Sequence, residues 1–132
     1  MRDKLLKLLE NSYCVYSNFP VAAIAVMNDG KEFYGVNVEN ASYGATICAE
    51  RSAIVSAISN GYKRKDFKEL YIMTKSNKVS TCCFMCRQVI SEMFPKDAKV
   101  TCMNETDEKV YTVSDLCTFP FDDEDLKWNQ DL

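Results

Sequence analysis

Three cysteines carry the chemistry that stands out in this chain. Cys48 directly precedes a helical pattern, and Cys83 and Cys86 lie at the start of another. Two cysteines three residues apart on a helix project from one face and can share one metal ion. A helix N-terminus favours thiolate, because its partial positive charge stabilises the anion. The spacing therefore predicts a zinc site with three thiolates and an open fourth position, which is typical of catalytic zinc.

Other interpretations of the cysteines stay open on the residues alone. A lone C-x-x-C fits a redox pair or two buried thiols as well as a metal site. A redox pair, however, does not need a second motif such as Cys48-Ala49-Glu50. The remaining Cys14, Cys102 and Cys117 are interpreted as small core residues.

The chain of 132 residues contains no histidine. This excludes Ser-His-Asp and Cys-His catalysis, so any general base must be a group other than imidazole. Lys and Arg number 16 against 19 Asp and Glu, a net charge of −3. An acidic domain without a basic stripe is not expected to bind nucleic acid or an anionic membrane.

The cysteine count and the N-terminal pattern bear on the compartment. Seven cysteines cannot all pair within one chain. The apolar runs within residues 1–10 are too short for a secretory signal core or a membrane span. We therefore expect a cytoplasmic protein with reduced thiols, folded as a single domain over residues 1–132.

The hydrophobic pattern predicts helices and strands in the order αββαβαββ. Helices are expected at 2–13, 48–61 and 84–93, and strands at 21–27, 32–38, 70–74, 99–103 and 109–113. Asn28-Asp29-Gly30-Lys31 is a turn signal that makes 21–38 a hairpin. The acidic stretch 122–132 is expected at the periphery. This order favours an α/β fold in which helices cover the faces of a mixed sheet.

Four segments form an ordered set along the chain. They are Tyr16-Ser17-Asn18-Phe19-Pro20-Val21, Gly35-Val36-Asn37-Val38-Glu39-Asn40-Ala41-Ser42-Tyr43, Cys48-Ala49-Glu50-Arg51-Ser52-Ala53 and Cys86-Arg87-Gln88-Val89. Zinc deaminases share a ligand followed by a glutamate two residues on, and a later cysteine pair. The set resembles the small cytidine deaminases of pyrimidine salvage. This resemblance implies a three-layer α/β/α fold with a mixed five-stranded sheet.

The resemblance also implies roles for individual residues. Cys48, Cys83 and Cys86 resemble the ligands of one zinc ion per chain, and Glu50 resembles a proton shuttle that is not a ligand. Contacts to the substrate are implied for Phe19, Asn37, Glu39, Ala49, Tyr43 and Phe121. The implied reaction is hydrolysis of cytidine and deoxycytidine to uridine and deoxyuridine plus ammonia. Without the resemblance, Asn37 and Glu39 would be ordinary polar residues at a strand end and Phe19 an ordinary core residue.

A three-thiolate site has a charge problem that points to Arg51. Zn²⁺ with three thiolates carries a formal charge of −1, which disfavours ionisation of a bound water. Two helix N-termini can draw charge from the sulfurs. Arg51 resembles an arginine of the family that donates to the thiolates, and it supplies the cation that the site needs.

The chain departs from the family pattern at two positions beside a ligand. Cys82 and Phe84 stand where the family has proline and glycine. Counting back from Cys86 makes Cys83 the ligand and leaves Cys82 without a role in metal binding. These departures bear on pocket shape and substrate range rather than on the catalytic groups.

The C-terminal residues suggest an assembly. Residues 116–121 are strongly apolar, and residues 122–125 are all acidic. An exposed apolar patch of this kind marks an interface. The resemblance implies a homotetramer in which Phe121 and Tyr43 reach a neighbour's site. The alternative is that Phe119 and Phe121 cover their own core.

Two rival functions use the same residues. One is a related zinc deaminase acting on another cytosine- or aminopyrimidine-containing small molecule. The other is a non-enzymatic module stapled by zinc. Glu50 beside the ligands and the open fourth position argue against the second rival.

Overall fold

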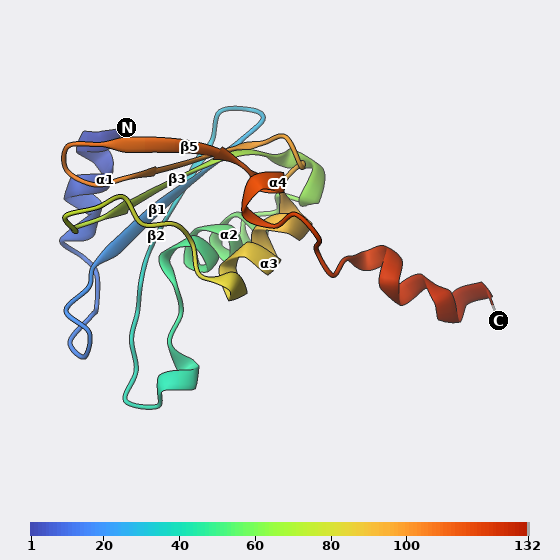
Figure 1. Ribbon diagram of the computed structural model, residues 1–132, viewed down its shortest axis with the longest axis horizontal. Coiled ribbons are helices and arrows are strands. Elements are labelled where there is room, and N and C mark those ends of the chain that lie inside the picture. Colours follow the sequence, from blue (N-terminus) through green and yellow to red (C-terminus); the bar gives the residue numbers. More distant parts are fainter. Residues whose placement is uncertain (132) are drawn as a thin grey trace.

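A mixed five-stranded sheet forms the centre of the protein (Figure 1). The computed structural model describes the backbone of residues 1–131 and the side chains of residues 1–127. The strands are β1 (Val21–Met27), β2 (Glu32–Val36), β3 (Phe67–Thr74), β4 (Lys99–Met103) and β5 (Glu108–Thr112). Their order is β2-β1-β3-β4-β5, and β3 and β4 are the parallel pair. The mixed sheet predicted from the sequence is confirmed.

The hairpin β1–β2 forms where the turn signal placed it. Gly30 adopts a φ of 88°, a left-handed conformation that glycine reaches without steric cost. The Asp29 carboxylate accepts a hydrogen bond of 2.9 Å from the backbone N–H of Lys31, which closes the turn. Strand β1 is apolar throughout because neighbours cover it on both faces and both edges.

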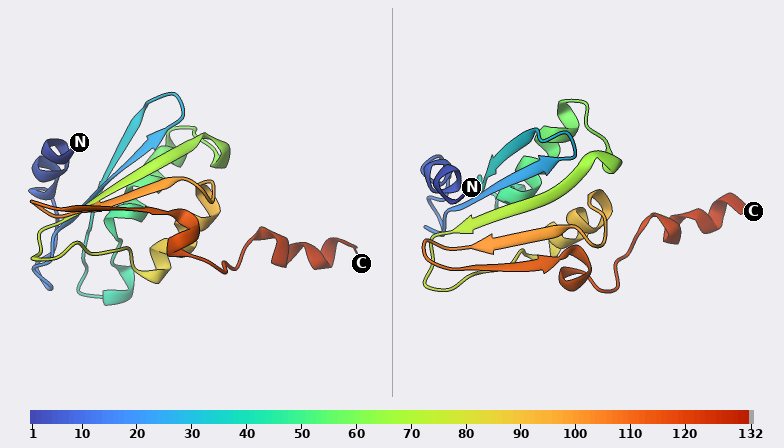
Figure 2. Two further views of the ribbon diagram at one scale, coloured as in Figure 1. Left: turned by 45° about the horizontal axis from the view of Figure 1, so that its top comes forward. Right: turned by 90° about the horizontal axis from the view of Figure 1, so that it is seen from above.

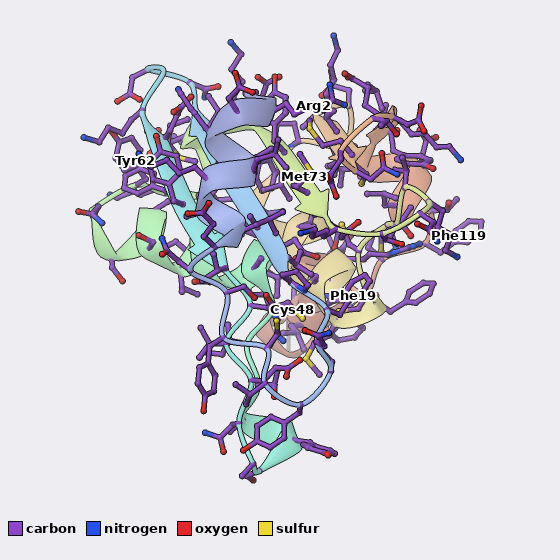
Figure 3. All side chains as sticks on the ribbon, turned by 90° about the vertical axis from the view of Figure 1, so that its left-hand side faces the viewer. Arg2, Phe19, Cys48, Tyr62, Met73 and Phe119 are labelled. Atoms are coloured by element: carbon purple, nitrogen blue, oxygen red, sulfur yellow. The ribbon has the colours of Figure 1, made fainter. Side chains whose placement is uncertain are left out.

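Helices cover both faces of the sheet, giving three layers (Figure 2). Helix α1 (Arg2–Leu9) packs its buried leucines on Ile24, Met73 and Met103. Met73 is labelled beneath this helix in Figure 3. Helices α2 (Ala49–Ser59) and α3 (Phe84–Met93) lie on the opposite face, which holds the larger core.

The sheet topology brings the starts of α2 and α3 together. Strand β1 is antiparallel to both β2 and β3, so β2 and β3 end at the same edge of the sheet. Helix α2 follows β2 and helix α3 follows β3. Both helices therefore begin beyond that edge and run back across one face, with their N-termini side by side.

Helix α2 lies close to β2 because the facing residues of both elements have small side chains or none. Ala49, Ala53 and Ala57 are fully buried on the inner side of the helix. A Cβ placed on Gly35 of β2 would lie 2.4 Å from the carbonyl oxygen of Ala49 and 2.4 Å from the backbone nitrogen of Ala53. Gly35 thus sets the depth at which the N-terminal half of α2 sits.

The structure corrects several predicted element bounds. The helix expected over 2–13 ends at Leu9, because the N–H of Tyr13 donates to the carbonyl of Asn37 instead (3.0 Å). The helix expected over 48–61 spans 49–59, and the strand expected over 70–74 begins at Phe67. Helix 84–93 and strand 99–103 have the predicted bounds.

The C-terminal part holds elements that the hydrophobic pattern did not indicate. These are the short helix α4 (Val113–Leu116) and a 3₁₀ helix at Asp123–Asp131. The second projects away from the body (Figures 1 and 2), in keeping with the peripheral position expected for 122–131. Leu132 lies outside the described residues. No helix in the described chain has the length and apolar character needed to span a membrane.

Gly35→Ala should lower the free energy of unfolding by about 1–3 kcal/mol, the usual effect of forcing a methyl group into a packed interior. The reason is the contact with the backbone of α2, which cannot rotate away as a side chain can. Gly44→Ala is the matched control, since a Cβ there meets nothing within 4 Å. Urea unfolding measures both variants, and equal stabilities would contradict this account of the α2–β2 contact.

Candidate metal centre and adjoining cavity

Three thiols meet where the N-termini of α2 and α3 lie side by side. Cys48 is the N-cap residue of α2, Cys83 is the N-cap residue of α3, and Cys86 lies in the first turn of α3. Their sulfur atoms all lie within 4.8 Å of one another, and those of Cys48 and Cys83 are 3.8 Å apart. This spacing suits three ligands of one ion, and thiolate donors are typical of zinc.

The electrostatics of the group favour thiolate. Hydrogen bonding with Cys86 and with Arg51 lowers the pKa of the Cys48 thiol to about 5, against the opposing effect of burial. The same hydrogen bond with Cys48, together with burial, raises the pKa of Cys86. The Sγ atom of Cys83 also accepts a hydrogen bond of 3.4 Å from the backbone N–H of Cys86.

Arg51 supplies a positive charge beside the sulfurs, as the sequence predicted. Its Nη2 lies 3.5 Å from the Sγ of Cys48, one turn earlier on α2. Its Nε is buried and has no hydrogen-bond partner within the described part of the chain. A buried N–H group without an acceptor is costly, so an anionic group near the Nε of Arg51 would be favourable. The N–H groups of Arg51 and the three sulfurs together fit a site in which three thiolates bind a cation.

Cys82 belongs to a different environment from its neighbour Cys83. Its side chain is buried, and hydrogen bonding with Cys102 together with burial raises the pKa of its thiol. It is not part of the sulfur group that can hold a metal. Cys83, and not Cys82, therefore belongs to the group of sulfurs that could hold a metal ion.

A cavity of about 420 Å³ opens beside the sulfur group. Its walls come from the strand ends and from the starts of α2 and α3: Ser17, Phe19, Val21, Asn37, Glu39, Thr46, Cys48, Ala49, Glu50, Ile72, Thr74, Ser80, Thr81 and Cys83. Figure 3 shows Phe19 beside Cys48. A volume of this size is typical of sites for small organic molecules. Another cavity, of about 450 Å³, lies near the far end of α3 and shares no lining residue with this one.

Glu50 is the buried acid of the cavity. It occupies the first turn of α2 and is only 4% exposed. Burial raises the pKa of its carboxyl group, and the nearby Cys48 charge acts in the same direction. Ala49 beside it is fully buried, so the α2 backbone itself forms part of the wall.

Asn37 holds the far wall of the cavity together. Its Oδ1 accepts hydrogen bonds from the N–H of Val21 (2.9 Å) and from the Ser12 hydroxyl. Its Nδ2 donates to the carbonyl of Phe19 (2.8 Å). An amide nitrogen carries two hydrogens, and the described residues provide an acceptor for only one of them. The second N–H of Asn37 is therefore available to a ligand. The side chain of Asn37 therefore mainly connects Ser12, Phe19 and Val21 by hydrogen bonds. The sequence did not indicate this structural role.

Glu39 is held as a carboxylate by the segment that contains Phe19. It accepts hydrogen bonds from the backbone N–H groups of Tyr16 (2.9 Å) and Ser17 (3.1 Å) and from the Ser17 hydroxyl. The Ser17 hydroxyl is the main cause that lowers the pKa of Glu39. A fixed carboxylate at the rim of the cavity is an acceptor for hydroxyl groups.

Two predicted site residues lie outside this cavity. Tyr43 is 76% exposed and packs edge-on against Tyr16 at a centroid distance of 6.0 Å. Phe121 is 59% exposed on the C-terminal segment, where its carbonyl accepts from Gln88 Nε2 (2.6 Å). Phe121 lies with Phe84 and Phe119 along a groove distinct from the metal centre. Within one chain, neither ring meets the cavity.

Sequence reasoning missed several polar residues that line the cavity. Thr74, Ser80 and Thr81 come from the end of β3 and the segment that leads to Cys83. Nothing in their local pattern marks them, because short hydroxyl residues are ordinary at strand ends. Ser17 lies inside a recognised motif, but only its hydrogen bonds to Glu39 reveal what it does.

Comparison with known proteins identifies relatives over most of the chain. The profile of the cytidine and deoxycytidylate deaminase zinc-binding region matches residues 1–103. The chain is 41% identical over 118 residues to the cytidine deaminase of Halalkalibacterium halodurans, covering 89% of this chain and 88% of the relative. It is 37% identical over 114 residues to that of Mycoplasma genitalium, covering 86% of each.

Solved structures give the same picture. The crystal structure of cytidine deaminase from Burkholderia pseudomallei matches with a TM-score of 0.86 at 38% identity, covering 90% of this chain and 94% of that one. The cytidine deaminase of Mycobacterium tuberculosis matches with a TM-score of 0.77 at 30% identity, covering 92% and 94%. The three-layer fold is shared with these enzymes.

The Cys82/Cys83 pair gives a direct test of the metal centre. Cys83→Ser should lose most of the bound zinc, because it removes one of three sulfurs within 4.8 Å. Cys82→Ser should retain about one zinc per chain, since its thiol lies against Cys102. Elemental analysis of purified protein measures both variants. Loss of zinc from the Cys82 variant with retention in the Cys83 variant would shift the ligand register by one residue.

Proposed function

Because the chain belongs to the cytidine and deoxycytidylate deaminase family, we propose that it hydrolyses cytidine and deoxycytidine to uridine and deoxyuridine plus ammonia. Such a reaction would serve pyrimidine salvage. The observation that carries the proposal is one arrangement: three thiols that fit zinc, with a buried glutamate beside them in a cavity of nucleoside size. A purely structural zinc site has no need of the glutamate or the cavity.

In the proposed reaction the metal site provides the nucleophilic water and Glu50 transfers the protons. Cys48, Cys83 and Cys86 would hold the zinc ion, which when bound would supply a polarised water molecule as the nucleophile at neutral pH. Glu50 accepts a proton from the attacking water and passes it to N3 of the ring, which makes C4 electrophilic. It then takes the remaining proton of the former water from the new C4 hydroxyl and delivers it to the exocyclic nitrogen, so that the C4–N bond breaks and ammonia leaves. Glu50 suits this role because the chain has no histidine and its side chain lines the cavity.

Arg51 adjusts the charge of the metal centre in this proposal. Donation from its guanidinium to the Cys48 sulfur withdraws negative charge from the ligands. The N-termini of α2 and α3 act in the same direction, because Cys48 and Cys83 are their N-cap residues. Together these groups offset the excess charge of three thiolates.

The residues that line the cavity support one orientation of the nucleoside, with the sugar at one end and the base at the other. The Glu39 carboxylate and the free N–H of Asn37 offer an acceptor and a donor for sugar hydroxyls. Phe19 lies beside Cys48 and provides an apolar wall for the base. The backbone at Ala49 borders the base beside Glu50.

We further propose that the working unit is a homotetramer whose sites are shared between chains. Phe121 and Tyr43 support this, because both rings are exposed and neither reaches the cavity of its own chain. The segment that carries Phe121 projects from the body (Figure 1). Such a segment can complete a neighbour's pocket by stacking an aromatic ring on the base.

The cytoplasm is the proposed location. All seven cysteines are free, and three of them form the metal group. Thiols in such a group stay reduced most readily in a reducing compartment.

The proposed reaction can be tested with Glu50→Gln. The variant should keep its zinc, because Glu50 is not a ligand, and lose turnover by about 10²-fold or more, since proton transfer is removed. The decrease in cytidine absorbance on deamination measures the rate. Glu92→Gln, on the exposed side of α3, is the control and should retain full activity. A wild-type protein that binds zinc without converting any cytosine nucleoside would refute the proposal.

The shared site can be tested with Phe121→Ala. Loss of a stacking ring costs about 0.5–1.5 kcal/mol beyond area burial, so KM should rise by roughly three- to tenfold. Phe119→Ala is the matched control: this ring is 96% exposed on the same segment and should leave KM near the wild-type value.

Light scattering at the assay concentration decides the assembly. A tetramer that loses activity as it dissociates is expected from sites shared between chains. A fully active monomer would refute the shared site.

A further inference from the structure

Thr74 is a buried polar residue whose hydroxyl makes no hydrogen bond among the described residues. It is the last residue of β3 and only 3% exposed. Its hydroxyl is buried and has no hydrogen-bond partner among the described residues. Leaving such a group unpaired costs free energy, so buried hydroxyls normally have a partner. The same residue lines the cavity beside the metal centre.

The sheet register places Thr74 in line with Asn37. Thr74 pairs with Val21 across β3 and β1, and the backbone N–H of Asn37 donates to the carbonyl of Val21. Residues directly opposite in neighbouring strands have side chains on the same face. All three residues line the cavity, so they form a row across its floor.

The length of this row matches the length of a nucleoside. Neighbouring strands lie about 4.8 Å apart, so roughly 10 Å separates Asn37 from Thr74. Asn37 is at the end proposed for the sugar. The row runs from there toward the segment that contains Ser80, Thr81 and Cys83, which is the end proposed for the base. Ile72, the next inward-facing residue of β3, is apolar, so Thr74 is the polar group on this part of the strand.

Resting on the proposed function, we infer that the Thr74 hydroxyl hydrogen-bonds the pyrimidine base of the bound nucleoside. Rotation about χ1 turns the hydroxyl into the cavity, and the bound base then satisfies a group that is unpaired without it. Thr74 is thus a residue that determines affinity for the base, alongside the backbone of α2. It takes no part in moving protons.

Thr74→Val tests this inference, because it keeps the shape of the side chain and removes the hydroxyl. KM for cytidine should rise about three- to tenfold with kcat nearly unchanged, the size of one hydrogen bond. The melting temperature of the free, zinc-loaded variant should stay equal or rise, since an unpaired buried hydroxyl is lost. Thr74→Ser retains the hydroxyl and should restore KM. Thr101→Val is the control, a buried threonine of β4 that does not line the cavity.

The other outcomes overturn the inference. An unchanged KM with an equal or higher melting temperature means that the base does not use the hydroxyl. An unchanged KM with a lower melting temperature means that the hydroxyl serves the fold. A fall in kcat at unchanged KM means that Thr74 acts through Glu50. If the wild type fails to deaminate cytidine, the proposed function fails. Titration with uridine then tests whether the Thr74 hydroxyl binds the base. Equal affinities of the wild type and Thr74→Val for uridine would refute that contact.

Discussion

Three sulfur atoms within 4.8 Å of one another are the constraint on which this architecture depends. Thiolates at this separation repel, so the fold must supply positive charge on several sides. It does so by ending β2 and β3 at one edge of the sheet, which sets the N-termini of α2 and α3 side by side. Their partial positive charges act on Cys48 and Cys83, and Arg51 adds a full charge. The close packing of α2 on Gly35 fixes how deeply the N-terminal half of α2 sits on the sheet. A change in sheet order or in helix depth would separate the sulfurs.

The cavity is built on the same edge, by loops that are tied down with side-chain hydrogen bonds. Asn37 joins Ser12, Phe19 and Val21, and Glu39 joins Tyr16 and Ser17. Loops bound in this way present a preformed wall opposite the metal centre, which reduces the entropy lost when a ligand binds. The polar groups used for structure and those offered to a ligand are partly the same. Asn37 keeps one N–H free, and Glu39 keeps lone pairs toward the cavity. Substitution of either residue would therefore alter the wall as well as any contact to the ligand.

The C-terminal segment contrasts with this rigid centre. It leaves α4 with Phe119 and Phe121 exposed, and its described contacts to the body include the Gln88–Phe121 hydrogen bond of 2.6 Å and the Arg64–Asp123 ion pair of 3.2 Å. Exposed ion pairs of this kind contribute little stability. Exposed aromatic rings on a projecting segment are poorly explained by a lone chain and well explained by a neighbour that covers them. The proposed tetramer would make Phe121 part of the wall of a neighbour's cavity, so assembly and substrate binding would both depend on this ring.

The sequence by itself determined the elements that rest on local pattern. The hairpin at 21–38 follows from its turn residues, helix 84–93 from its apolar spacing and Pro95, and the candidate group of three metal-binding cysteines from two cysteine motifs. The tertiary structure decided what depends on contacts between distant residues. Helix α1 ends at Leu9 because Tyr13 pairs with Asn37, and Cys82 is set apart from the metal because it meets Cys102. Thr74 becomes a cavity residue only through its register with Val21. A local pattern fixes backbone preference and the face that a residue occupies, whereas the partner of a polar side chain depends on which strand lies next to it, and that is set by the packing of the whole sheet.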